Sequence, residues 1–146
     1  MKIERIKREH LRGLAALEAL CFDAPWSEQA LELLVGDTAL GFTCLDESGT
    51  PIAYVGMVTV LDEGQITNVA THPDHRRQGL ADKLLVALLA EARSRLITTL
   101  TLEVRESNAA AIALYRKHGF SAVGRRNHFY KNPREHALVM LARIGE

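Results

Sequence analysis

The chain has 146 residues, 47% of them apolar and 25% charged, and its 18 basic residues equal its 18 acidic ones. This composition is typical of a soluble globular protein, and the length predicts a single domain over residues 1–146. The lack of a basic excess argues against nucleic acid or a membrane surface as a partner. No apolar run approaches the roughly 18 residues of a membrane span. The charged N-terminus also lacks the apolar stretch of a signal peptide, so we expect a cytoplasmic protein.

The N-terminal third predicts a short strand and two helices. Residues 2–6, KIERI, alternate in polarity, which favours a strand. Leucines recur at helical spacing over residues 8–22, which predicts an amphipathic helix. Ser27 then provides a side-chain cap for a second helix, and Gly36 provides its end.

The remaining sequence predicts a meander of strands, then alternating helices and strands. Residues 41–73 indicate three strands, with turns at 46–51 and 62–64, and so an antiparallel arrangement. The later predicted elements are a helix over 80–96, a strand over 96–104, a helix over 107–120, and strands over 120–130 and 136–144. This order predicts a mixed α/β (α+β) fold whose sheet is antiparallel early and uses a crossover helix in the middle.

Cysteine and histidine patterns give no indication of a metal site. Cys21 and Cys44 stand in apolar contexts without zinc-site spacing, so we expect two buried, reduced thiols rather than a disulfide. His72 and His75 lie close together, but no third ligand is near them in the sequence, and we expect no metal.

The segment Asn68 to Leu85, NVATHPDHRRQGLADKLL, combines features of an anion site. A predicted strand leads through a turn into a helix, whose first N–H groups and dipole favour an anion. Gly79 lets a ligand approach the backbone, and Arg76 and Arg77 add donors that suit phosphate oxygens. The segment predicts a site for a phosphorylated ligand, in particular a pyrophosphate. Taken alone, it also fits a helix cap with solvated charges.

Two long runs, ITNVATHPDHRRQGLADKLL (66–85) and LTLEVRESNAAAIALYRKHGF (100–120), resemble the GNAT superfamily of acetyl-CoA-dependent N-acetyltransferases. The first matches the family's strand, its [RQ]-x-x-G-x-[GA] pyrophosphate loop, formed here by Arg76, Gly79 and Ala81, and its helix. The resemblance covers most of the chain. It implies a central mixed sheet of about seven strands with helices on both faces, acetyl-CoA as cosubstrate and no metal.

Shorter runs narrow the resemblance to the GNAT enzymes that acetylate the N-terminal alanine of a small-subunit ribosomal protein. These runs are PWSE (25–28), LEVRESNAAAIALY (102–115) and RRN (125–127). The resemblance implies that the partner is a protein or peptide N-terminus. We expect the enzyme to be a monomer or a weak oligomer.

The resemblance assigns Glu103 as the general base, acting through water, and Tyr115 as the general acid. The residue pattern is compatible, because Glu103 lies on the polar side of a strand and Tyr115 shares a helix face with Asn108 and Ile112. A raised glutamate pKa and a lowered tyrosine pKa would suit proton transfer near neutral pH. Without the resemblance, the commoner interpretations would be a glutamate that faces solvent or pairs with Arg105, and a tyrosine that belongs to the core.

The resemblance also implies which residues contact the cofactor. The strand end would offer backbone groups to the pantetheine arm, the following turn would surround the pyrophosphate, and an asparagine would cap its helix and reach the cofactor. The expected contacts are Val69, Ala70, Thr71, Arg76, Arg77, Gln78, Gly79, Leu80, Ala81, Asp82 and Asn108.

The sequence departs from the family pattern at two places and leaves three functions open. Ala81 replaces a glycine, and His128-Phe129-Tyr130 replaces paired tyrosines, which leaves the wall of the acceptor pocket undefined. The open functions are a peptide N-terminal acetyltransferase, a GNAT enzyme for another small amine, and a non-catalytic CoA- or partner-binding module. Glu103 and Tyr115 argue against the last. An α-amine pKa near 8, against about 10.4 for lysine, favours an N-terminal acceptor.

Overall fold

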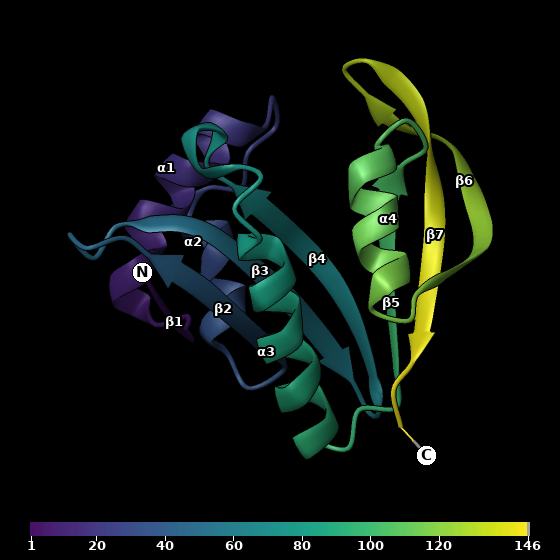
Figure 1. The fold of residues 1–146 in the computed structure, drawn as a ribbon, viewed down its shortest axis with the longest axis horizontal. Coiled ribbons are helices and arrows are strands. Elements are labelled where there is room, and N and C mark those ends of the chain that lie inside the picture. The colour runs from purple at the N-terminus through teal and green to yellow at the C-terminus, as the bar shows by residue number, and fades with distance from the viewer. Residues whose placement is uncertain (146) are drawn as a thin grey trace.

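Seven strands form one mixed sheet in the computed structural model, which describes residues 1–145 (Figure 1). The strands are β1 (Lys2–Arg5), β2 (Ala39–Leu45), β3 (Pro51–Val60), β4 (Glu63–Thr71), β5 (Thr99–Arg105), β6 (Ser121–Lys131) and β7 (Arg134–Arg143). The α-helices are α1 (Leu11–Cys21), α2 (Glu28–Leu31), α3 (Leu80–Ser94) and α4 (Ala109–Lys117), and 3-10 turns lie at Arg8–His10, Glu32–Val35 and Pro73–His75. The predicted element order and fold class are confirmed.

The helix predicted from Ser27 to Gly36 is interrupted in the structure. Its start is as expected, since the Ser27 hydroxyl oxygen accepts a hydrogen bond from the Ala30 N–H at 3.1 Å. The helix tightens to 3-10 geometry after Leu31. Because side chains three apart then lie on one side, Leu31 and Leu34 are both buried against the sheet.

The strand order is β1-β2-β3-β4-β5-β7-β6, and every neighbouring pair is antiparallel except β4 and β5. Helix α3 makes the crossover between these two parallel strands, as the sequence predicts. β1 and β6 are the edges of the sheet.

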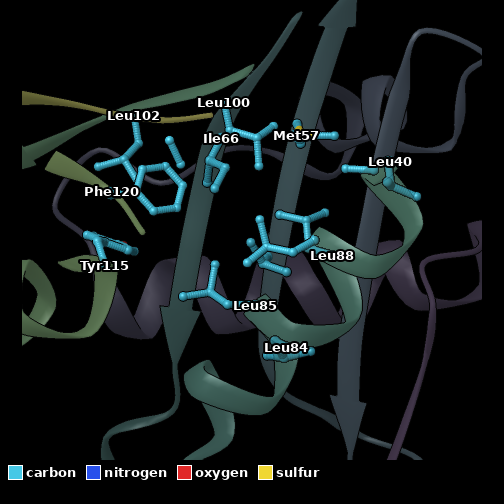
Figure 2. Close-up of a cluster of buried hydrophobic side chains, with 14 of the residues drawn as sticks. Leu40, Met57, Ile66, Leu84, Leu85, Leu88, Leu100, Leu102, Tyr115 and Phe120 are labelled. Carbon is cyan, nitrogen blue, oxygen red and sulfur yellow. The ribbon is translucent and has the colours of Figure 1, made fainter. Parts of the chain in front are cut away.

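Two hydrophobic cores lie on opposite faces of the sheet, which confirms helices on both faces. On one face, Leu84, Leu85 and Leu88 of α3 pack on strand residues that include Leu40, Met57 and Ile66 (Figure 2). Tyr115 of α4 and Phe120 extend this core over β5. On the other face, α1 and the α2 segment cover strand residues that include Ala39, Tyr54 and Ala70. Within residues 1–145 no helix is long and apolar enough to cross a membrane.

Candidate active site

Strands β4 and β5 are paired over only three residues each and then separate. Glu63–Gln65 pair with Thr99–Thr101, and beyond these residues each strand keeps only its antiparallel neighbour on the other side. Figure 1 shows the two strands diverging toward the N-terminal ends of α3 and α4. The separation follows a β-bulge, because Gly56 pairs with Asn68 and Met57 with Ile66, so that Thr67 is the extra residue. A bulge bends its strand and increases the local twist, which turns β4 away from β5.

A cavity of about 690 Å³ lies between the separated strands. Its walls come from the ends of β4 and β5, the α1–α2 loop, α4 and the β6–β7 hairpin. The lining residues are Glu18, Cys21, Phe22, Asp23, Ala24, Trp26, Ile66, Thr67, Asn68, Val69, Leu102, Glu103, Val104, Arg105, Asn108, Ala111, Tyr115, Phe129, Tyr130, Lys131, Asn132 and Pro133. This volume is ordinary for a small-molecule site, and the cavity combines apolar walls with a few charged groups.

A second, smaller hollow of about 180 Å³ follows along β4 at the start of α3. It is lined by Thr71, His75, Arg76, Arg77, Gly79, Leu80, Ala81, Asp82 and Leu114. The first intrahelical bond runs from the Lys83 N–H to the Gly79 carbonyl at 3.1 Å. The N–H groups before Lys83 therefore have no partner within the helix, and the positive end of its dipole lies at this hollow.

Two residues of this turn, Arg77 and Gly79, have left-handed backbone conformations, with φ of 64° and 74°. A Cβ atom at Gly79 would meet nothing within 4 Å. The backbone angle, rather than lack of room, is what calls for glycine at this position.

Asp82 links the start of α3 to the end of α4. Its Oδ1 lies 2.9 Å from the Lys117 Nζ and 2.8 Å from the His118 Nε2. Hydrogen bonds from Lys117 and His118 hold the pKa of Asp82 below its usual range. The Asp82 carboxylate is occupied by Lys117 and His118 and is itself negative. Asp82 can therefore bind an anion at the helix start only through its backbone N–H.

Glu103 lies on β5 with its side chain at the large cavity. Its Oε1 accepts a hydrogen bond from the Gln65 side chain at 3.3 Å, and its Oε2 is 3.7 Å from the Arg126 Nε. The alternative pairing with Arg105 is wrong, because Arg105 contacts Glu135 at 3.2 Å.

Tyr115 is only 6% exposed and also lines the large cavity. Its ring packs edge to face on Phe120, with centroids 5.9 Å apart. Burial, with a smaller contribution from Tyr130, raises the pKa of Tyr115 to about 12. The structure therefore does not lower the pKa of Tyr115 as would suit proton transfer, because α4 packs this side chain into the core.

The β6–β7 hairpin supplies the wall that the sequence left undefined. A bulge between Arg126 and Tyr130 interrupts its ladder. Phe129 and Tyr130 line the cavity, and the Arg105 guanidinium carbon lies 4.4 Å from the centre of the Tyr130 ring. His128 is not among the lining residues.

Most of the predicted cofactor contacts lie at the two hollows, but two do not. Val69 and Asn108 line the large cavity, and Asn108 caps α4 by accepting a hydrogen bond from the Ala111 N–H at 3.2 Å. Ala70 is instead 5% exposed in the core under α1, because alternate strand residues face opposite sides of the sheet. Gln78 is exposed on the turn and lines neither hollow.

Sequence reasoning missed Glu18, a buried carboxylate of α1 that lines the large cavity. The pattern contained a signal, since Glu18 falls four residues after Leu14 and seven after Leu11, on the apolar stripe of its helix. A charged residue at a stripe position indicates a buried polar contact.

Cys21 and Cys44 are both free thiols, and burial raises the pKa of each, but Cys21 is only partly buried. The rings of His72 and His75 lie edge to face with centroids 5.6 Å apart. No three His, Cys, Asp or Glu side chains group as metal ligands within residues 1–145.

The fold and the site together define a GNAT enzyme, and the chain belongs to the acetyltransferase (GNAT) family, whose family model matches residues 11–120. It is 42% identical over 123 residues to the ribosomal protein bS18-alanine N-acetyltransferase of Escherichia coli strain K12, covering 83% of this chain and 82% of that one. It is 32% identical over 146 residues to a putative enzyme of the same name from Bacillus subtilis strain 168, covering 99% and 96% of the two chains.

Solved structures agree with this assignment. The crystal structure of the ribosomal-protein-S18-alanine N-acetyltransferase from Escherichia coli superposes with a TM-score of 0.91 at 36% identity, covering 99% of this chain and 94% of that one. A chain of the NatC complex bound to Gag peptide and CoA is 21% identical with a TM-score of 0.82, covering 98% and 99%. The second likeness concerns the fold alone.

Replacing Gly79 with alanine should destabilise the protein by about 1–2 kcal/mol, because a left-handed backbone is costly for a residue with a Cβ. Gly124→Ala is the matched control, since Gly124 also has open space around it but no left-handed backbone. Urea denaturation monitored by circular dichroism measures both. Equal midpoints for the two variants would contradict the assignment of strain to Gly79.

Proposed function

We propose that the enzyme transfers an acetyl group from acetyl-CoA to the N-terminal α-amine of a protein, with alanine as the first residue. The small-subunit ribosomal protein bS18, named for its relatives, is the proposed target. The observation that carries the proposal is the sequence of features along β4. The cavity with Glu103 and Tyr115 lies beside β4, and the start of α3, with its unpaired N–H groups and arginines, lies beyond the end of the same strand.

The residues present fit acetyl-CoA. The free N–H groups at the start of α3, with Arg76 and Arg77 beside them, suit the pyrophosphate. From Ile66 to Thr71 the backbone of β4 has no strand neighbour on its β5 side within residues 1–145. The Thr71 carbonyl accepts hydrogen bonds from the Cys21 Sγ at 3.4 Å and the Arg76 Nε at 3.3 Å. The outward-facing amide and carbonyl groups before it can bond an amide-containing pantetheine arm as a strand would. This arm would extend from the hollow at α3 to the large cavity.

The reaction needs one proton removed and one supplied. As the amine nitrogen bonds to the acetyl carbon, Glu103 accepts the amine proton through a water molecule. As the carbon–sulfur bond breaks, the Tyr115 hydroxyl donates a proton toward the departing sulfur and regains one from solvent. A positioned acid or base of this kind contributes about 10²- to 10⁴-fold to a rate.

The raised pKa of Tyr115 has two consequences for this role. With a pKa of about 12 the hydroxyl stays protonated across the physiological range, as a proton donor must. It is also a weaker acid than an ordinary tyrosine. A thiol has a pKa of about 8.5, so Tyr115 acts first as a hydrogen-bond donor that stabilises negative charge on sulfur.

The charged lining of the cavity has a small acidic excess, with Glu18, Asp23 and Glu103 against Arg105 and Lys131. Residues 13–75 contain ten acidic residues and no lysine or arginine, although the whole chain is neutral. This segment supplies Glu18 and Asp23 to the cavity, and Glu103 lies on the other side. At pH 7.4 roughly a quarter of N-terminal amines are neutral, against about 0.1% of lysine side chains. One carboxylate acting through water thus suits an α-amine better than a lysine.

The proposal is tested by incubating the enzyme with acetyl-CoA and a short peptide that begins Ala-Arg, and separately with free lysine or spermidine. Mass spectrometry of the product locates the acetyl group. We expect acetylation at the α-amine of the peptide and little of the small amines. An unmodified peptide beside an acetylated small amine would contradict the proposal.

Glu103→Gln should lower kcat by about 10²- to 10⁴-fold with CoA affinity unchanged, because the isosteric amide cannot accept the proton. Glu106→Gln is the matched control, since Glu106 contacts Arg125 at 3.3 Å and is not among the cavity residues. Tyr115→Phe should also lower kcat.

In the wild type the rate should rise with pH through the α-amine pKa near 8, and should not fall through ionisation of Tyr115 until about pH 12.

Steady-state rates over pH 6–10, with calorimetric CoA titrations, measure these effects. Wild-type kcat in Glu103→Gln would remove Glu103 from the mechanism. A basic limb below pH 10 that disappears in Tyr115→Phe would contradict the protonated state assigned to Tyr115.

A further inference from the structure

Glu18 carries a carboxylate but is only 2% exposed, so its burial requires strong partners. Its Oε2 accepts a hydrogen bond from the hydroxyl of Tyr54 on β3 at 2.5 Å. Its Oε1 accepts one from the backbone N–H of Trp26 at 2.9 Å. Both carboxylate oxygens are therefore used in holding other parts of the chain.

The α1–α2 loop, Phe22–Trp26, is tied to Glu18 at both ends. At its start the Phe22 N–H donates to the Glu18 backbone carbonyl at 2.9 Å, and at its end the Trp26 N–H donates to the side chain. Phe22, Asp23, Ala24 and Trp26 line the large cavity. One residue thus fixes the loop that forms this wall.

Tyr54 connects the same carboxylate to the sheet beside the β4 bulge. It is 0% exposed and pairs with Ala70 of β4, next to the residues that line the cavity. Burial first, and the neighbouring Glu18 second, raise the pKa of Tyr54 well above its usual range, so its hydroxyl remains a donor. The loop on one wall and β4 are therefore held in a fixed relation through Glu18.

We propose that Glu18 is a positioning residue for the acceptor. By holding the Phe22–Trp26 loop against β3, it fixes the acceptor wall so that the first residue of the peptide meets Glu103. This inference rests on the proposed function. Removing one oxygen acceptor should loosen the loop while α3 and its hollow keep their own contacts.

The test compares Glu18→Gln and Tyr54→Phe with Glu4→Gln. A glutamine at 18 keeps one acceptor oxygen, so it can no longer accept from both Trp26 and Tyr54. Glu4 is the matched control, because it contacts the buried His10 at 2.9 Å and is not among the cavity residues. KM is measured separately for an Ala-Arg peptide and for acetyl-CoA.

In Glu18→Gln the peptide KM should rise about tenfold, equivalent to about 1.4 kcal/mol, as expected for losing a hydrogen bond to a charged group. The KM for acetyl-CoA should stay unchanged, and Tyr54→Phe should follow the same pattern. Glu4→Gln should lower the melting temperature and leave both KM values as in the wild type.

Trp26 gives a second readout that needs no activity, because it is the chain's single tryptophan and lies in the loop itself. Acrylamide should quench its fluorescence more strongly in Glu18→Gln than in the wild type. In Glu4→Gln the quenching should equal that of the wild type. This measurement also serves Tyr54→Phe if Glu18→Gln folds poorly.

The outcomes separate the inference from the proposed function. If the wild type leaves the peptide unacetylated, the proposed function fails, and the acceptor role of Glu18 fails with it. If the wild type is active, an unchanged peptide KM in Glu18→Gln overturns the inference, whether or not quenching rises. The inference would also be overturned if both KM values rose equally in Glu18→Gln and Glu4→Gln showed the same rise. Glu18 would then contribute only to the stability of the fold.

Discussion

The short parallel pairing of β4 and β5 is the constraint on which the rest of the site depends. Three residue pairs hold the strands together, and the extra residue Thr67 then turns β4 away. Had the pairing continued, side chains and ladder hydrogen bonds would close the space between the strands. The separation instead provides a strand edge without a strand neighbour, a cavity beside it, and a helix start at the end of the same strand. The proposed cofactor and acceptor sites both follow from it.

Much of this arrangement could be predicted from local patterns. The side-chain caps at Ser27 and Asn108, the leucine stripe of α3 and the glycine before Leu80 depend on neighbours within a few residues, so spacing reveals them. The sequence does not reveal contacts between distant segments. The side chain of Ala70 faces the second core because of strand alternation, and Arg105 meets Glu135 through the fold of the last hairpin. The pKa of Tyr115 is raised by burial in a core built from several elements, so the sequence of α4 alone does not reveal it.

On the acceptor side of the cavity, the same residues contribute to the stability of the fold and to the binding of the proposed acceptor. Tyr115 is a core residue that also reaches the cavity, and Glu18 is a buried charge on an otherwise apolar helix face. Each gives up some packing or solvation to place a polar group beside the proposed reaction centre. Residues 13–75, which include Glu18, contain no lysine or arginine, so the acidic residues of an overall neutral chain are concentrated in one part of its sequence. Such a distribution suits a positively charged peptide without requiring net charge.

The central claim, that the edge of β4 and the start of α3 bind the cofactor together, is tested most directly by amide hydrogen exchange with and without CoA. We expect slower exchange within Ile66–Thr71 and at Gly79–Asp82 when CoA is added, and unchanged exchange along the edge strand β1, none of whose residues lines either hollow. Protection that appears at β1 but not at β4 and α3 would contradict the claim.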